Sequence, residues 1–343
     1  MTPDARPGAH PHAQRDTPPP ARGRPIPARL TGSRHTEPDQ SLITAVDDRV
    51  AAPEHNRGTS MDTDEKTTPP RLSTARSREL GEELRRIRHR ARLSSAVVAE
   101  SLGWSLGKLS KLETGTRSTS PWEIATLIGR CAADKAIRDR IMTIAHEPDT
   151  GTFTRPHAGH PDTLTALTLH ERTAATITTY EPLTVPALAQ TRTYARALIG
   201  GEDLADARIA RQEVLRPDGG PTTVFYIHET ALRLVVGDRA VMRDQLLHLT
   251  LLAGQPNVTA HVIPLTAPAH PALFHHTTLL TFEPPTRPLA YSENGTTTVF
   301  HDNLAEVEHC RRRMRELHAR TLPAAQSREV IAHWADAYDK RTR

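Results

Sequence analysis

The sequence predicts a multidomain protein. It consists of an all-α domain of five helices, a larger α+β domain after it, and a disordered tail before both. Three observations lead to this organisation. Apolar residues recur at helical spacing between positions 77 and 146. Beyond position 162, helical stretches alternate with short runs of β-branched and aromatic residues. The segment 1–75 is rich in proline and arginine and poor in aliphatic residues.

The segment 1–75 is predicted to be disordered. Ten of the chain's 28 prolines fall within positions 1–60. Such a segment cannot bury enough apolar surface to offset its conformational entropy. Met61 is followed by Asp-Thr-Asp-Glu and is an alternative start of translation, which the intact mass of the native protein would decide. The rival interpretation of the tail is a basic arm that touches DNA.

The all-α domain is predicted to span residues 76–146. An amphipathic helix over 77–91 opens it, with apolar positions at Leu80, Leu84, Ile87 and Ala91. The run Ser120-Pro-Trp-Glu123 is a strong helix start, because it offers a capping serine, a proline at the first helical position and a glutamate three residues after the cap. Residues 134–146 supply the fifth helix. Five short helices in about 70 residues make a compact domain.

Residues 94–115 are predicted to be two short helices around one tight turn. Ala99 is small where the helices must approach each other, and Gly103 falls where the backbone leaves the first helix. Ser105 can cap the second helix through its hydroxyl. The positions that such a unit must bury are apolar: Val98, Leu102, Trp104, Leu109 and Leu112. The pattern therefore predicts a helix-turn-helix.

Charge indicates what this unit binds. Lys108, Ser110 and Lys111 lie opposite Leu109 and Leu112, so the exposed face of the second helix is basic and polar, which suits the major groove of DNA. Between residues 71 and 120 there are eleven Lys or Arg and five Asp or Glu, a net charge of +6, whereas the whole chain carries +4. A positive excess on one domain is expected of a module that neutralises phosphates. The alternative to DNA binding is that the positive charge only forms a solvated face of the first helix. Five arginines lie close together there: Arg85, Arg86, Arg88, Arg90 and Arg92.

Residues 77–131 resemble the lambda-repressor/Cro-like, or Xre-type, helix-turn-helix family. The resemblance is most specific at Ala99, Gly103, Leu109, Leu112, Glu113 and Gly115. It implies that 105–113 is the recognition helix, that Leu106, Gly107, Ser110 and Lys111 face base edges, and that Ser95 stands where many members carry a phosphate-contacting glutamine. Leu106 and Gly107 lack hydrogen-bonding side chains, so base readout is thin and the lysines contribute mostly phosphate affinity. The candidate DNA-contacting residues are Ser95, Ser105, Leu106, Gly107, Lys108, Ser110, Lys111 and Arg117.

The α+β domain is predicted over residues 163–340, after a linker at 147–162 that is rich in Pro, Gly and Thr. Asn294-Gly295 is a two-residue hairpin signal. Pro217–Pro221 is a loop, and Arg311-Arg-Arg313 is read as a solvated helix face. The predicted helices are 162–180, 190–199, 202–215, 238–253, 303–320 and 327–338. The predicted strands are 223–228, 258–263, 277–283, 288–293 and 296–301.

A second resemblance covers about residues 165–335. The run Val185-Pro-Ala-Leu-Ala-Gln-Thr-Arg-Thr-Tyr-Ala-Arg-Ala197 looks like the "VPGLLQT-x-x-YAR-A" pattern of actinobacterial regulators described as WhiJ-like or antitoxin-like. Ala187 and Ala189 depart from that pattern, and Phe274-His-His276 replaces a glycine- and serine-rich turn. The resemblance implies an Xre-type module joined to a C-terminal domain of uncertain role, with a small protein encoded nearby as a common partner.

The sequence offers little catalytic chemistry, and we expect no enzyme, no cofactor and no metal. It has no glycine-rich phosphate loop, Gly-x-Ser-x-Gly elbow or His-Glu-x-x-His motif. His270, His275 and His276 lie close together in the sequence, and His261 could join them. Two of these histidines could bind a metal together with a carboxylate such as Glu283. A chain that holds 19 histidines explains such a cluster more simply, because several fall on one loop by chance. Glu171, Glu229 and Glu293 have two interpretations. They could line a pocket, or, more simply, they could be structural residues that accept hydrogen bonds or pair with Arg196 or Arg211.

The remaining expectations concern location and partners. No apolar run is long enough to cross a bilayer, no signal peptide opens the chain, and two cysteines form no framework, which together predict a cytoplasmic protein. Cys131 is read as a small buried apolar residue. We expect a DNA-binding transcriptional regulator that acts as a homodimer on double-stranded DNA, modulated through its C-terminal domain by a small-molecule effector or a small partner protein. The alternative is an antitoxin-like or adaptor protein that mainly binds a small partner protein.

Overall fold

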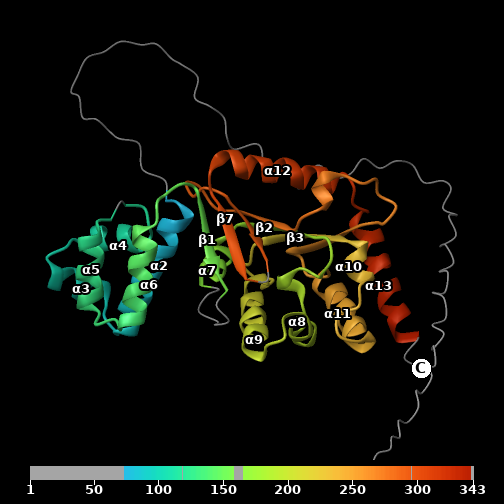
Figure 1. Ribbon diagram of the computed structural model, residues 1–343, viewed down its shortest axis with the longest axis horizontal. Helices are drawn as coiled ribbons and strands as arrows, with labels where there is room; N and C mark the ends of the chain where they lie inside the picture. The colour runs from blue at the N-terminus through green and yellow to red at the C-terminus, as the bar shows by residue number, and fades with distance from the viewer. Residues whose placement is uncertain (1–72, 118, 158–164, 295, 341–343) are drawn as a thin grey trace, which may run out of the picture. The chain divides into compact units, whose positions relative to one another are not determined.

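The computed structural model describes residues 73–117, 119–157, 165–294 and 296–340 (Figure 1). The predicted tail therefore lies outside the described residues except for its last three positions. Met61, as an alternative start, also lies outside them. Within the described part, the five-helix domain and the α+β domain appear in the predicted order.

The N-terminal domain consists of five helices that share one core. Their bounds are α2 (Ala75–Arg90), α3 (Ser95–Leu102), α4 (Leu106–Glu113), α5 (Pro121–Arg130) and α6 (Lys135–His146). The core is built from one apolar stripe of each helix, including Leu84, Val98, Leu109, Leu127 and Ile141, all fully buried. Burial of each such side chain contributes about 1.5–3 kcal/mol. Cys131 is buried at the edge of this core, as predicted.

The C-terminal domain is built on one seven-stranded sheet in the order β1-β7-β6-β5-β2-β3-β4. β2 runs parallel to β3, and β3 runs parallel to β4; the other neighbouring strands are antiparallel. The strands β1, β6, β2, β3 and β4 therefore all end at the same edge of the sheet. The strand bounds are β1 (Thr152–Pro156), β2 (Thr176–Glu181), β3 (Thr222–His228), β4 (Val258–Ile263), β5 (Thr277–Thr281), β6 (Leu289–Glu293) and β7 (Thr297–His301).

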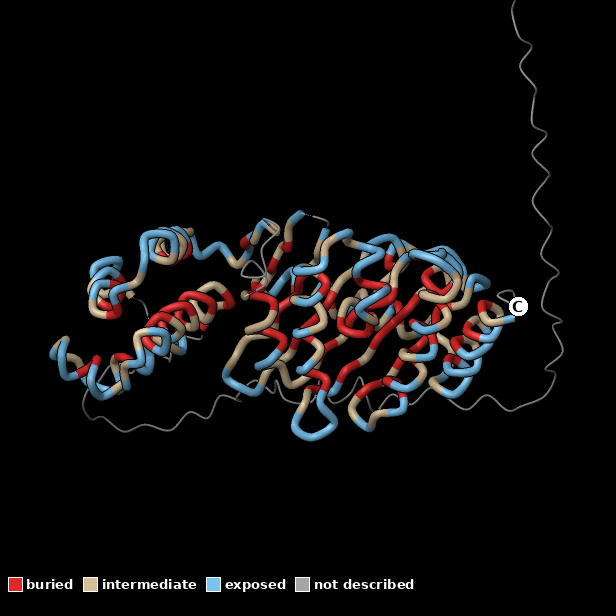
Figure 2. Tube along the Cα trace, turned by 90° about the horizontal axis from the view of Figure 1, so that it is seen from below, coloured by how far each residue is buried: buried red, intermediate tan, exposed pale blue. Residues whose placement is uncertain are grey.

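Helices cover both faces of this sheet (Figure 1). One face packs Tyr180, Tyr226 and Leu279 against Met314 and Leu317 of α12. The other face packs Ile177, Phe225 and Leu280 against the remaining helices. Most positions of β3, β4 and β5 are buried, whereas buried positions alternate with half-buried ones along β7; buried residues are red in Figure 2. The helix bounds are α7 (Thr165–Thr173), α8 (Arg192–Ile199), α9 (Glu202–Arg211), α10 (Glu229–Arg233), α11 (Arg239–Leu252), α12 (Leu304–His318) and α13 (Ala324–Lys340).

Two strands stand where the sequence predicts something else. The segment 162–180 was expected to be one helix, but α7 ends at Thr173 and β2 begins at Thr176. β2 lies in the middle of the sheet, and pairing on both sides outweighs the apolar spacing that imitated a helix. Strand β1 lies inside the predicted linker, where it pairs with β7 as an edge strand and tolerates a proline at its end. The short helix α10 was also missed.

The other predicted strands and helices are confirmed to within a few residues. β6 and β7 pair antiparallel, which confirms the predicted hairpin, but Glu293 lies opposite Thr298, whereas a two-residue loop at 294–295 would have placed it opposite Thr296. Gly295 itself lies outside the described residues. The run Arg311–Arg313 is not simply a solvated face, because Arg313 is partly buried and donates hydrogen bonds to the carbonyl of Ala272 and the hydroxyl of Thr277.

Candidate nucleic-acid interface

Local signals fix the turn between α3 and α4. Gly103 ends α3 in the left-handed region, with φ of 64°. That conformation favours glycine, which has no Cβ to clash. The N–H groups of Gly103 and Trp104 return to carbonyls of α3. The Ser105 hydroxyl then accepts from the N–H of Lys108, 3.1 Å away, and so caps α4. The entry angle of α4 is therefore set by a few consecutive residues.

Helix α4 is divided into a buried face and an exposed face. Leu109 and Leu112 are buried against the domain core. The predicted base-facing positions are all on the surface: Leu106, Gly107, Ser110 and Lys111. Leu106 is 57% exposed although it is a large apolar residue. A Cβ added at Gly107 would meet open space, so the backbone there is accessible to a partner. One rigid face of α4 thus carries an exposed leucine, a bare backbone patch, a hydroxyl and a lysine.

A buried ion pair fixes the far end of α4. The carboxylate of Glu113, the last residue of the helix, accepts from Nε and Nη2 of Arg88 on α2 at 2.6 and 2.8 Å. The side chains of Arg88 and Glu113 are only 7% and 8% exposed. Arg88 also donates to the carbonyl of Leu93. Sequence reasoning counted Arg88 among the surface arginines, whereas it positions the candidate recognition helix.

Two glycines allow α2 to approach the end of α4. A Cβ on Gly81 would lie 2.5 Å from the carbonyl oxygen of Glu113. Gly115, two residues after the end of α4, has φ of 69°, and a Cβ there would overlap the carbonyl group of Ser77. The Ser77 hydroxyl donates to the Gly115 carbonyl. This close approach of the two backbones adds to the Arg88–Glu113 ion pair in holding α4 against α2.

The two lysines of α4 have different environments. The ammonium of Lys108 lies 2.8 Å from a carboxylate oxygen of Glu123 and 4.3 Å from the ring centre of Trp104. The hydrogen bond from Lys108 lowers the pKa of the Glu123 carboxyl. Lys111 is exposed and forms no ion pair with any residue that the structure describes. Lys108 therefore ties α4 to α5, and Lys111 is the lysine of α4 that is available to a phosphate.

The other candidate contacts lie at the start of α3, in the turn and beyond the end of α4. Ser105 and Arg117 are exposed, and Arg117 shares the Glu123 carboxylate at 3.3 Å. Ser95 begins α3 and is partly exposed. Like Lys108, Arg117 must exchange a protein partner for a phosphate if it contacts DNA.

The positive excess of this domain is not all on the α4 face. Arg78 is partly buried, and desolvation lowers its pKa to about 10. Arg85 and Arg90 instead line a cleft of about 740 Å³ between α2 and α7, together with Arg172. Part of the net charge of +6 therefore belongs to internal ion pairs and to a second surface. Net charge is thus weaker support for DNA binding than the exposed face of α4, which these arginines do not change.

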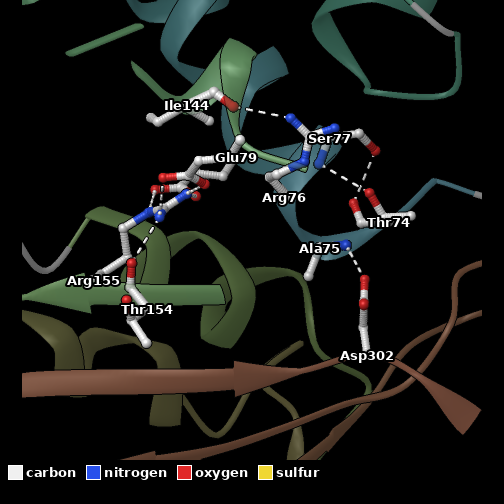
Figure 3. A network of polar contacts seen from close by, with 10 residues as sticks. Thr74, Ala75, Arg76, Ser77, Glu79, Ile144, Thr154, Arg155 and Asp302 are labelled. Carbon is white, nitrogen blue, oxygen red and sulfur yellow. Dashed lines mark hydrogen bonds and ion pairs between the residues drawn. The ribbon is translucent and has the colours of Figure 1, made fainter. Parts of the chain in front are cut away.

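The helical domain is joined to the sheet domain by polar contacts at both of its ends (Figure 3). At the start of α2, the N–H of Ala75 donates to the Asp302 carboxylate at 2.6 Å. After α6, Arg155 of β1 binds Glu79 of α2 through two hydrogen bonds of 2.6 and 2.5 Å. Arg155 also binds Glu147, which follows α6. Strand β1 thus connects directly to α2, the helix that braces α4 through Arg88.

Two of the three glutamates singled out in the α+β domain have structural roles. Glu171 is the buried partner of Arg211, as the structural interpretation expected. Glu229 accepts from the N–H of Leu265. No group of His, Cys, Asp and Glu within the described ranges has the arrangement of a metal site. None of the helices in those ranges is long and apolar enough to cross a membrane.

The fold and this surface define a class, the helix-turn-helix proteins. Residues 79–141 match the family model of a helix-turn-helix domain, and residues 164–333 match a domain of unknown function, DUF5753. No curated protein matches the chain. The chain therefore carries a helix-turn-helix domain, which supports a DNA-binding regulator, followed by a DUF5753 domain whose own role those comparisons do not give.

Proposed function

We propose that this chain is an Xre-type transcriptional regulator that binds an operator in double-stranded DNA through residues 105–113. The observation that carries the proposal is the division of α4, with Leu109 and Leu112 buried and Leu106, Gly107, Ser110 and Lys111 exposed. A groove-binding helix needs this rigid support together with a free face. In this proposal the chain acts by binding and catalyses no reaction.

The proposal includes a homodimer and a modulated affinity. Two copies place their α4 helices about 34 Å apart, so that the operator is a near-palindrome. The C-terminal domain binds an effector or a small partner protein, and it shifts affinity only if that ligand favours one of two states. The contacts of Arg155 and Ala75 offer a direct connection between the domains (Figure 3).

A DNA titration tests this function. Duplexes selected from a random pool by the full chain should share a near-palindromic site, and log affinity should fall linearly with log salt. Lys111→Ala should reduce the salt slope by about 1 and weaken binding on all sequences if it contacts phosphate. Lys135→Ala, at an exposed lysine of α6, is the matched control and should leave the slope unchanged. Failure to bind any duplex in dilute buffer would refute the proposal.

A second candidate function is an adaptor that uses the helical domain to bind a protein. It is favoured by the exposed apolar side chains of that domain, above all Trp122 at 80% exposure. Affinity that does not change with salt would support the adaptor over the regulator. The same titration therefore separates the two functions.

A further inference from the structure

The topology brings several polar side chains to one edge of the sheet. Glu181 ends β2, Glu293 ends β6 and His157 directly follows β1, and these three strands end at the same edge. His276 directly precedes β5, which runs in the opposite direction and so begins there. In open α/β sheets this edge is where ligands commonly bind.

Glu171 already satisfies the charge of the buried arginine at this edge. Arg211 is 2% exposed and donates to Glu171 through Nε and Nη2 at 2.9 and 2.6 Å. The Tyr291 hydroxyl donates to the same carboxylate at 2.8 Å. Glu171 and Arg211 therefore form a complete ion pair, and a second carboxylate is not needed to neutralise it.

Glu293 is nevertheless placed beside this pair. Its Oε2 lies 3.7 Å from Nη2 of Arg211, a separation too long for a hydrogen bond. Its Oε1 is shielded from solvent and accepts no hydrogen bond from the part of the chain that the structure describes. Nη1 of Arg211 is likewise buried and lacks an acceptor within that part. Leaving such groups unsatisfied destabilises a folded protein, so a partner for them is expected.

The surrounding groups complete a mixed donor and acceptor set. Arg208 donates to the side chain of Gln190 at 3.1 Å, and His276 Nε2 accepts from the Glu293 N–H at 2.6 Å, so that its Nδ1 carries the proton. Burial lowers the pKa of both His157 and His276. Burial also raises the pKa of Glu181 to about 8. For Glu293 burial works against ionisation, but Arg211 and Arg208 prevail and lower its pKa.

This balance of charge restricts the ligand. The arginines disfavour a metal cation, and Glu293 disfavours a phosphate or another compact anion. An N–H group of the ligand would satisfy Glu293 Oε1, and a neighbouring oxygen would satisfy a guanidinium nitrogen. Glu293 keeps 18% of its side chain exposed against 2% for Arg211, and Glu181, Arg208, His157 and His276 are only partly buried, so the cluster reaches the surface.

We propose that Glu293, Arg208 and Arg211, with Glu181, His157 and His276 around them, form a binding site for a small zwitterionic or neutral molecule that presents an N–H group next to an oxygen acceptor, as α-amino acids and their amides do. This inference deepens the effector part of the proposed function and rests on it only for its consequence at DNA. His157 is two residues beyond Arg155, which binds Glu79 of α2 (Figure 3). Occupancy of the site would thus act on the strand that holds the helical domain.

Ligand binding is tested on the full chain without DNA. The probes are the twenty common L-amino acids and their carboxamides, each at 10 mM in a thermal-shift assay, followed by calorimetric titration. At least one probe should raise the melting temperature by about 2 °C or more, and Glu293→Gln should weaken its binding about tenfold or more. Glu213→Gln, at an exposed carboxylate paired with Arg216, is the control and should bind as the wild type does. No binding by any probe, or equal binding by Glu293→Gln, overturns the proposal.

A second measurement separates a ligand group from a structural one. If Glu293 is kept for a ligand, Glu293→Gln without probe should melt at or above the wild-type temperature, whereas Glu171→Gln should melt well below it. A fall for Glu293→Gln as large as that for Glu171→Gln would make Glu293 a structural ion-pair partner and would refute the site. Since no DNA is present in either assay, failure here is distinct from failure to bind an operator.

Discussion

The ion pair between Arg88 and Glu113 gives the most decisive test of how α4 is held. Glu113→Leu removes the carboxylate but leaves the Arg88 guanidinium in place, where the wild-type side chain is 7% exposed. Two contacts of Arg88 remain, a hydrogen bond to the carbonyl of Leu93 and a longer contact of 3.5 Å to the ring of His89. The variant therefore leaves a buried charge without its counterion, which is the costly way to break such a pair.

The expected cost follows from that burial. Breaking a buried pair by removing one partner costs about 3–5 kcal/mol, whereas replacing both partners by apolar residues of similar volume is often neutral. For a domain of this size, about 1 kcal/mol corresponds to roughly 4–8 °C in melting temperature. Glu113→Leu should therefore lower the melting temperature of the helical domain by more than about 10 °C. Arg88→Met combined with Glu113→Leu should regain most of that loss.

The assay is thermal unfolding of the full chain followed by far-ultraviolet circular dichroism, with DNA affinity measured below the transition. Glu100→Ala, at an exposed glutamate of α3, is the matched control and should melt within about 1 °C of the wild type. A Glu113→Leu variant that melts within about 2 °C of the wild type would refute the reasoning. So would a double variant no more stable than the single one.

Three further predictions concern α4, its junction with α2, and the sheet edge. Lys108→Ala should cost about 1–2 kcal/mol of stability in urea unfolding, because it loses both an ion pair and a cation–π contact. Those contacts are with Glu123 and the Trp104 ring. Lys111→Ala is the comparison and should leave stability unchanged. Equal losses of stability in the two variants would contradict the distinction between the two lysines. Gly115→Ala should unfold the end of α4 and abolish DNA binding, since its Cβ would overlap the Ser77 carbonyl; a variant with wild-type affinity in a duplex titration would count against the close contact. The folded-state pKa of Glu181, about 8, lies above its ordinary value of 4.5, so protonation stabilises the fold at low pH. This contribution disappears as pH rises from 4.5 through about 8. In urea unfolding across that range, the wild type should lose stability relative to Glu181→Gln as pH rises, because the histidines contribute equally to both proteins; a stability difference that does not change with pH would argue against a protonated Glu181.

Most of the candidate interface could be predicted from the sequence, because the residues that fix the turn and the orientation of α4 act on near neighbours in the chain. Gly103 and Ser105 act on backbone atoms close to them in the chain, and Leu109 and Leu112 recur at the spacing of one helix face. The sequence did not distinguish Lys108 from Lys111. That distinction depends on Glu123, which is contributed by a different helix.

The sequence by itself determined the two classes of domain, their order, and the helix whose outer face is offered to a partner. Caps, glycine turns and apolar periodicity decide such features, since each depends on neighbours along the chain. Only the tertiary structure decided that residues 176–181 form a central strand, that Arg88 is a buried brace, and that Glu293 lies beside an ion pair that is already complete. Those outcomes depend on pairing and burial between segments far apart in sequence, and the energy of such contacts exceeds the local preferences that the sequence displays.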